Sequence, residues 1–71
     1  MSNPITISPE IQSGVPVFTG TRVPVKILFD YLKGGNSLEE FFEDFPSVTK
    51  EQVNRVLDIA ENVLTFGRLA A

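Results

Sequence analysis

Residues 15–25 read Val-Pro-Val-Phe-Thr-Gly-Thr-Arg-Val-Pro-Val, so two copies of Val-Pro-Val flank a turn-rich centre. Two prolines and a glycine restrict this stretch more than a simple connection between two elements would require. Proline fixes φ and removes a backbone donor, whereas glycine takes the positive φ of a tight turn without a steric penalty. The stretch therefore predicts an ordered turn at residues 19–21 that joins an extended segment to a helix.

On the N-terminal side of this turn, the sequence predicts a small β-hairpin. Residues 5–7, Ile-Thr-Ile, alternate and are β-branched, and residues 15–18 form a second short run after the break at Gly14. Pro16 cannot donate to a sheet ladder, so the second strand should lie at an edge or pair through its other residues. Two such strands are barely stable alone, and we expect residues 5–18 to pack against the rest of the chain.

On the C-terminal side, the sequence predicts a first helix from about Pro24 to Lys33. Proline is well suited to the first turn of a helix, and Gly34-Gly35 can end it in the left-handed conformation. On a helical wheel the polar side chains form only a narrow strip, which consists of Lys26, Asp30 and Lys33. We therefore expect this helix to be the central one, covered on most sides.

Two further helices are marked by capping boxes at Ser37–Glu40 and Thr49–Gln52. Pro46 stops the earlier of the two, and the later one should run to about Phe66, with Gly67 as its expected stop. The last helix carries one apolar stripe, made of Val53, Val56, Leu57, Ala60, Val63 and Leu64. These signals predict a mainly α domain, with a three-helix bundle at residues 24–66 behind a short β segment.

Composition narrows the classes of function. A chain of 71 residues forms one domain, 1–71, of marginal stability, and many chains of this size gain stability by oligomerising. Cysteine and histidine are absent, so we expect neither a disulfide framework nor a zinc site. No carboxylate is paired with a base, metal ligand or nucleophile in a recognisable motif, so we expect no enzyme activity and no cofactor. With neither a signal-peptide pattern nor an apolar run of membrane length, we expect a cytoplasmic protein.

The second and third helices could form a helix-turn-helix, because only about four residues join them. The first turns of the third helix offer side chains of the types that read base edges by paired hydrogen bonds, with a lysine beside them. The candidate DNA contacts are Lys50, Gln52, Asn54 and Arg55. The alternative is a plain three-helix bundle whose surface carries these common residues, and a net charge of −3 means that any DNA binding must rest on a local cluster.

The second helix has an acidic face, formed by Glu39, Glu40, Glu43 and Asp44. No basic residue occurs between Lys33 and Lys50. In a helix-turn-helix this face would lie near the phosphate backbone and repel it. The face could instead dock a basic protein, or it could simply be a solvated helix surface.

Ile59 and Phe66 lie to one side of the apolar stripe and widen it in the C-terminal half of the third helix. This pattern is typical of a self-association surface, and we expect a homodimer or a larger homo-oligomer. The alternative is that the wider face covers the hairpin.

The turn itself has two interpretations. Gly20 lets the turn close, and Thr21 and Arg22 could then point at a partner. Alternatively, the threonines cap the turn and Arg22 locks the hairpin onto the helices by binding a carbonyl group or a helix C-terminus.

Residues 14–25 resemble the signature Gly-x-Pro-Val-x-x-Gly-Thr-Arg-[Ile/Val]-Pro-Val of the bacterial and archaeal family called domain of unknown function 433. Residues 5–11, 32–37 and 45–49 resemble further segments of that family, so the resemblance spans about residues 5–64. Its motif positions fall on Gly14, Pro16, Gly20, Thr21, Arg22, Pro24 and Pro46.

The resemblance implies a homeodomain-like three-helix bundle preceded by a short N-terminal β-hairpin. Many members are named antitoxins and are encoded beside a small nuclease-like toxin. The resemblance therefore implies a non-enzymatic antitoxin that binds a cognate toxin, with its own operator DNA as a candidate second partner. The alternatives are a plain helix-turn-helix transcriptional regulator and an interaction or assembly module without a DNA role.

Overall fold

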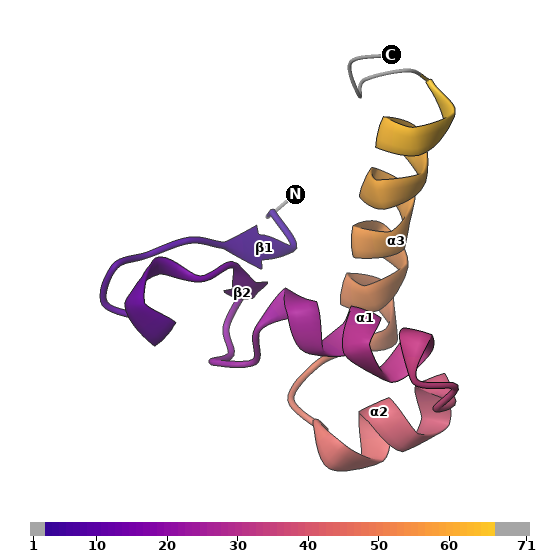
Figure 1. The fold of residues 1–71 in the computed structure, drawn as a ribbon. Coiled ribbons are helices and arrows are strands. Elements are labelled where there is room, and N and C mark those ends of the chain that lie inside the picture. Colours follow the sequence, from indigo (N-terminus) through magenta and orange to yellow (C-terminus); the bar gives the residue numbers. More distant parts are fainter. Residues whose placement is uncertain (1–2, 67–71) are drawn as a thin grey trace.

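The structure is a computed structural model that describes residues 3–66. Figure 1 shows a mostly helical chain that begins with a short hairpin. In chain order the elements are β1 (Ile5–Thr6), a 3-10 turn η1 (Gln12–Gly14), β2 (Val17–Phe18), α1 (Val25–Lys33), α2 (Leu38–Asp44) and α3 (Lys50–Thr65). The predicted order of a β segment followed by three helices is confirmed.

The hairpin is shorter than predicted. β1 and β2 are antiparallel, with Ile5 opposite Phe18 and Thr6 opposite Val17. Val17 also forms an isolated bridge with Pro24, so β2 lies between β1 and the start of α1. Pro16, which lacks an N–H, lies outside the strand, and its carbonyl accepts a 3.0 Å hydrogen bond from the Val25 N–H. The hairpin is therefore attached to α1 by its backbone.

The ends of α1 follow from its sequence. Pro24 is extended and immediately precedes the helix, which begins at Val25, one residue after the predicted start. At the other end Gly35 has a φ of +83°, which an L side chain rarely adopts, and the Asn36 N–H reaches back 2.9 Å to the Tyr31 carbonyl. A left-handed glycine thus ends α1 as predicted.

Both predicted capping boxes form. The Ser37 hydroxyl accepts from the Glu40 N–H at 3.1 Å, and the Glu40 carboxylate accepts from the Ser37 N–H at 2.9 Å. Thr49 and Gln52 make the same reciprocal pair at 3.1 and 3.0 Å. Each box satisfies two backbone donors that a helix start would leave open, which fixes where α2 and α3 begin.

The core gathers around the ring of Phe41, which is fully buried. Its aromatic neighbours lie at ring-centroid distances of 5.2 to 6.1 Å and are Phe18, Tyr31, Phe42 and Phe45. The other buried members of this cluster are Val25, Leu28, Val48, Val53 and Val56. The sequence predicts that α1 is covered on most sides, but Leu32, in its last turn, is 38% exposed.

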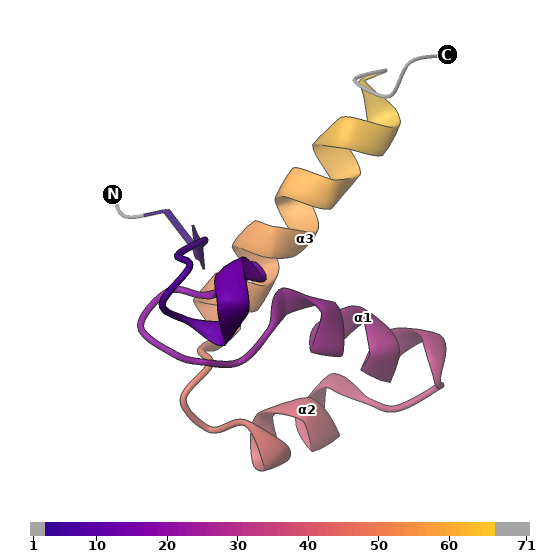
Figure 2. The same cartoon turned by 60° about the vertical axis from the view of Figure 1, so that its left-hand side comes forward.

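α3 belongs to the core only in its N-terminal half. Val53 and Val56 are buried, whereas Leu64 is 70% exposed and Phe66 is 73% exposed. Figures 1 and 2 show the C-terminal turns of α3 extending away from α1, α2 and the hairpin. The predicted stop at Gly67 lies outside the described residues. Within residues 3–66, no helix combines the length and hydropathy that crossing a membrane requires.

Candidate interaction site

The signature loop is a closed, hydrogen-bonded turn. Gly20 has a φ of +82°. The Thr21 N–H and hydroxyl both donate to the Phe18 carbonyl, at 3.0 and 2.8 Å, and the Thr21 hydroxyl accepts from the Val23 N–H at 3.0 Å. The Phe18 N–H in turn donates to the Val23 carbonyl at 3.0 Å. The side chain of Thr21 therefore belongs to the turn.

Arg22, at the same turn, has an exposed side chain that makes no hydrogen bond or ion pair with residues 3–66. Within this part of the chain, the contact that would lock the hairpin onto the helices is absent. The turn is shaped instead by Gly20 and Thr21. The guanidinium group of Arg22 is thus presented to the solvent beside a rigid loop.

The remaining motif positions shape the backbone. Gly14 has a φ of +88° at the tip of the hairpin, where Gln12 and Ser13 also have positive φ values. The Pro16 carbonyl accepts a hydrogen bond from the Val25 N–H at the start of α1, and Pro24 immediately precedes that helix. Pro46 is exposed in the turn that follows α2.

Gln52 connects the loop to α3. Its side-chain Nε2 donates to the Thr19 carbonyl at 2.8 Å, while its Oε1 accepts from the Thr49 N–H. Both ends of this amide are engaged within the fold. Of the predicted DNA contacts, Lys50 and Asn54 are exposed, and Arg55 is half-buried.

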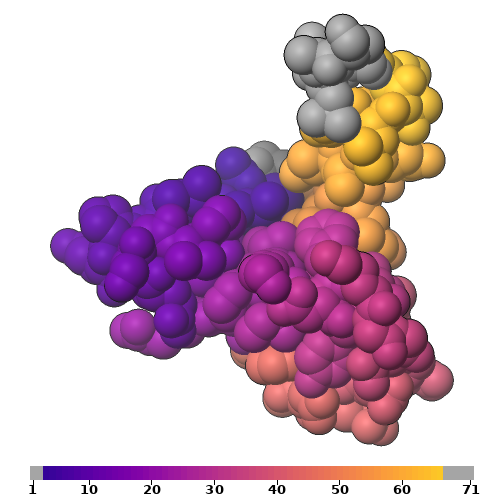
Figure 3. Space-filling view, viewed as in Figure 1, coloured from indigo at the N-terminus to yellow at the C-terminus, as the bar shows by residue number. Residues whose placement is uncertain are grey.

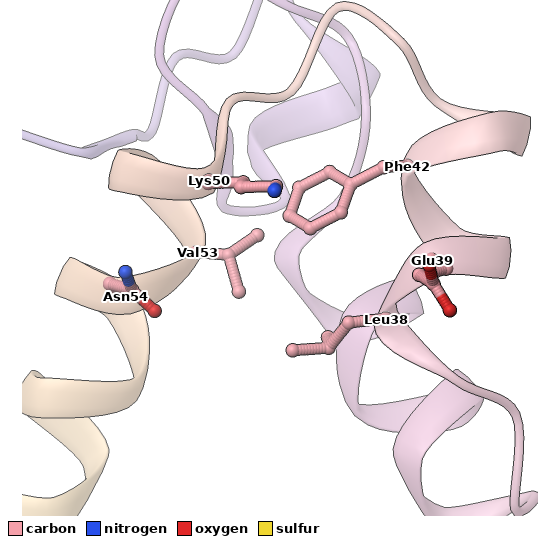
Figure 4. Close-up of a pocket in the computed structure, with 6 residues that line it drawn as sticks. All are labelled: Leu38, Glu39, Phe42, Lys50, Val53 and Asn54. Atoms are coloured by element: carbon pink, nitrogen blue, oxygen red, sulfur yellow. The ribbon is translucent and has the colours of Figure 1, made fainter.

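A hollow of about 250 Å³ lies between α2 and α3. Figure 4 shows Leu38, Phe42 and Val53 pointing into it from the two helices. Its polar lining residues are Glu39 from α2 and Lys50 and Asn54 from α3. The sequence predicts Glu39 on an acidic surface and Lys50 and Asn54 on a separate DNA-contact surface, and no local pattern indicates that the three border one hollow.

The acidic face of α2 divides into two pairs. The Glu40 carboxylate caps the helix, and the Asp44 carboxylate accepts a 2.5 Å hydrogen bond from the Tyr31 hydroxyl. This hydrogen bond raises the pKa of Tyr31 above its ordinary value. Glu39 and Glu43 are exposed and form no hydrogen bond or ion pair with the other described residues. These two carboxylates lie one turn apart, and Glu39 borders the hollow.

The described residues therefore form a small, mainly helical domain with a Gly-Thr-Arg loop between its β-hairpin and its first helix. Residues 5–60 match the family described as Protein of unknown function (DUF433), and the chain belongs to this family. It is similar to the uncharacterized protein y4eO of Sinorhizobium fredii (strain NBRC 101917 / NGR234), with 39% identity over 57 residues. That match covers 80% of this chain and 26% of the relative, so the chain spans about a quarter of that protein's length. No solved structure matches the chain.

Proposed function

We propose that this domain is a non-enzymatic antitoxin-type protein that binds a small nuclease-like toxin, the role that its family resemblance implies. The observation that carries the proposal is the exposed acidic pair Glu39 and Glu43 beside the apolar hollow. A nuclease binds phosphates through a basic surface. An acidic helix with an adjacent apolar hollow suits such a surface, because protein interfaces combine an apolar centre with a polar rim.

In this proposal the hollow receives an apolar side chain of the toxin, and the two carboxylates meet its basic residues. Leu38, Phe42 and Val53 supply the apolar surface of the hollow. Glu40 and Asp44 are already hydrogen-bonded within the fold, so they support the negative potential of the face more than they make new contacts. Arg22 provides a second contact on the signature loop.

A pull-down from the native lysate with charge-reversal variants tests this proposal. The double variant Glu39→Lys/Glu43→Lys should lose a nuclease-like partner that the wild-type protein retains in stoichiometric amount. The matched control is Asp58→Lys/Glu61→Lys, which changes two exposed carboxylates on α3 and alters the net charge equally. Retention of the partner by the α2 variant, or its equal loss from the control, would refute the assignment of the site.

The second candidate is a homeodomain-like helix-turn-helix that binds operator DNA. The exposed side chains of Lys50 and Asn54 at the start of α3 favour it. Two or three phosphate contacts per chain would give a salt slope of only about −2 to −3, so useful affinity needs at least a dimer. Binding of operator DNA at moderate salt, and its loss in Lys50→Ala/Asn54→Ala, would support this candidate.

A further inference from the structure

The hollow between α2 and α3 has a negative charge on one side and a positive charge on the other. The side chain of Glu39 borders it from α2, and the side chain of Lys50 borders it from α3. Both side chains are exposed, and they form no ion pair or hydrogen bond with each other or with any other part of residues 3–66. The space-filling view shows α2 on the outer surface of the molecule, away from the hairpin (Figure 3). A ligand of the hollow can therefore meet a carboxylate and an ammonium group together.

A second polar group accompanies the lysine. Asn54 lies one helical turn after Lys50, so the two side chains share a face of α3. The amide of Asn54 adds a hydrogen-bond donor to the ammonium group, and donors of these two kinds suit a carboxylate. Figure 4 shows Glu39 on the opposite helix, across the hollow from Asn54. The hollow is thus arranged to take an anionic group at α3 and a cationic group at α2.

The floor of the hollow is apolar and small. Leu38 and Phe42 from α2 and Val53 from α3 line it (Figure 4). Its volume of about 250 Å³ is below the roughly 300–1,000 Å³ of pockets that hold drug-sized ligands. An apolar group that enters the hollow leaves water, which is favourable. The hollow therefore suits a ligand with one apolar group of the size of an amino-acid side chain.

We propose that this hollow binds a free apolar α-amino acid, such as leucine. The ammonium group of the ligand binds the Glu39 carboxylate, its carboxylate binds Lys50 and Asn54, and its side chain enters the hollow. A zwitterion is complementary to both charged sides. A simple amine would meet the Lys50 ammonium group as a like charge, and a simple acid or a nucleotide would meet the Glu39 carboxylate as one. Because the proposed function places a toxin side chain in the same hollow, the amino acid would compete with that contact.

Titration of the purified, isotope-labelled protein with L-leucine, followed by the NMR shifts of its backbone amides, tests this site. The signals of residues 38–42 and 50–54 should shift with a dissociation constant of about 1 mM, since a ligand of this size buries few atoms. Related compounds each lack one group of leucine: isocaproate lacks the ammonium group, isoamylamine lacks the carboxylate, and glycine lacks the apolar side chain. Each should bind at least about fivefold more weakly than leucine.

Glu39→Gln should weaken leucine binding about fivefold without weakening isocaproate binding, because isocaproate has no ammonium group. The matched control is Glu43→Gln, which removes an exposed carboxylate of α2 that does not line the hollow and should keep the wild-type affinity. The proposal is overturned by an absence of shifts at leucine concentrations far above a millimolar, by equal binding of any of the related compounds, or by equal losses in the two glutamate variants. Because the titration needs only the purified protein and leucine, failure of the antitoxin proposal would not affect it.

Discussion

The side-chain amide of Gln52 donates a 2.8 Å hydrogen bond to the backbone carbonyl of Thr19, although 33 residues separate them in the sequence. The oxygen of the same amide accepts from the Thr49 N–H and completes the capping box of α3. One side chain therefore starts a helix and holds the signature loop against it. The position of the loop therefore depends on a residue that the sequence predicts as a DNA contact.

We predict that Gln52→Glu will be less stable than the wild type by about 1–2 kcal/mol in urea unfolding. A glutamate can keep the capping box, because its carboxylate still accepts from the Thr49 N–H. It has no N–H to offer to the Thr19 carbonyl, which would lose its side-chain partner.

Glu40→Ala provides the comparison, because Glu40 completes the other capping box without any link to the loop. It should lose about 1 kcal/mol, whereas Gln52→Ala should lose more. Equal losses in these two variants, together with wild-type stability for Gln52→Glu, would show that the loop contact contributes nothing.

Arg22→Ala should leave the thermal stability unchanged within about 0.5 kcal/mol, since its exposed side chain makes no polar contact with residues 3–66. Thr21→Val, next to it, should cost about 1–2 kcal/mol because it removes both hydrogen bonds of the Thr21 hydroxyl. If Arg22 contacts the toxin, Arg22→Ala should also lose toxin binding while remaining folded. Marked thermal destabilisation of Arg22→Ala would instead show that Arg22 holds the hairpin against the helices.

The single tyrosine should titrate above its ordinary pKa of about 10. The Tyr31 hydroxyl donates to the Asp44 carboxylate, and this bond is lost when the phenol ionises. Because the folded-state pKa is the higher one, the stabilisation is present below the unfolded-state pKa and is lost as the pH rises through the folded-state pKa. Ultraviolet absorbance reports this residue directly, because the chain has no tryptophan.

Asp44→Ala should return the pKa of Tyr31 towards its ordinary value. Glu43→Ala is the control, since it removes a neighbouring carboxylate that does not bind the phenol. An equal fall of the tyrosine pKa in both variants would mean that net charge, and not the hydrogen bond, causes the shift.

Phe41→Ala should cost about 3–5 kcal/mol, because the ring is fully buried against four other aromatic rings. A domain of this length has a total stability of only about 4–10 kcal/mol, so much of the variant should be unfolded. Phe66→Ala, which removes a ring that is 73% exposed, should change the stability of the single chain by less than about 0.5 kcal/mol. Circular dichroism in urea distinguishes these outcomes, and similar losses in both variants would contradict the description of the core.

Local signals made most of the fold predictable. The capping boxes at Ser37 and Thr49 involve residues only three positions apart, and the left-handed end of α1 depends on Gly35 alone. Such features involve residues that are no more than about one helical turn apart, so the local sequence is almost sufficient to predict them. The hairpin is present as predicted, but its strands are shorter. Pro16 lies outside the second strand, and its carbonyl accepts a hydrogen bond from the Val25 N–H of α1.

The contacts that define the candidate site are nonlocal. No pattern in the sequence links Gln52 to Thr19, or places Glu39 and Lys50 at one hollow, because these contacts depend on how the elements pack. Periodicity identified the apolar face of α3 correctly. It could not indicate that neighbouring elements bury Val53 and leave Leu64 exposed, because a helical wheel carries no information about what covers a face.

The unbroken length of α3 makes it a spacer as well as a core element. Ten residues separate Lys50 from Ala60, or about 15 Å of helix at 1.5 Å per residue. The exposed apolar side chain of Leu64 lies further along, at about 21 Å from Lys50 along the helix axis. Inserting or deleting one helical turn between Lys50 and Leu64 would change that separation by about 5.4 Å. A molecule that contacts the polar start of α3 therefore need not touch its apolar end.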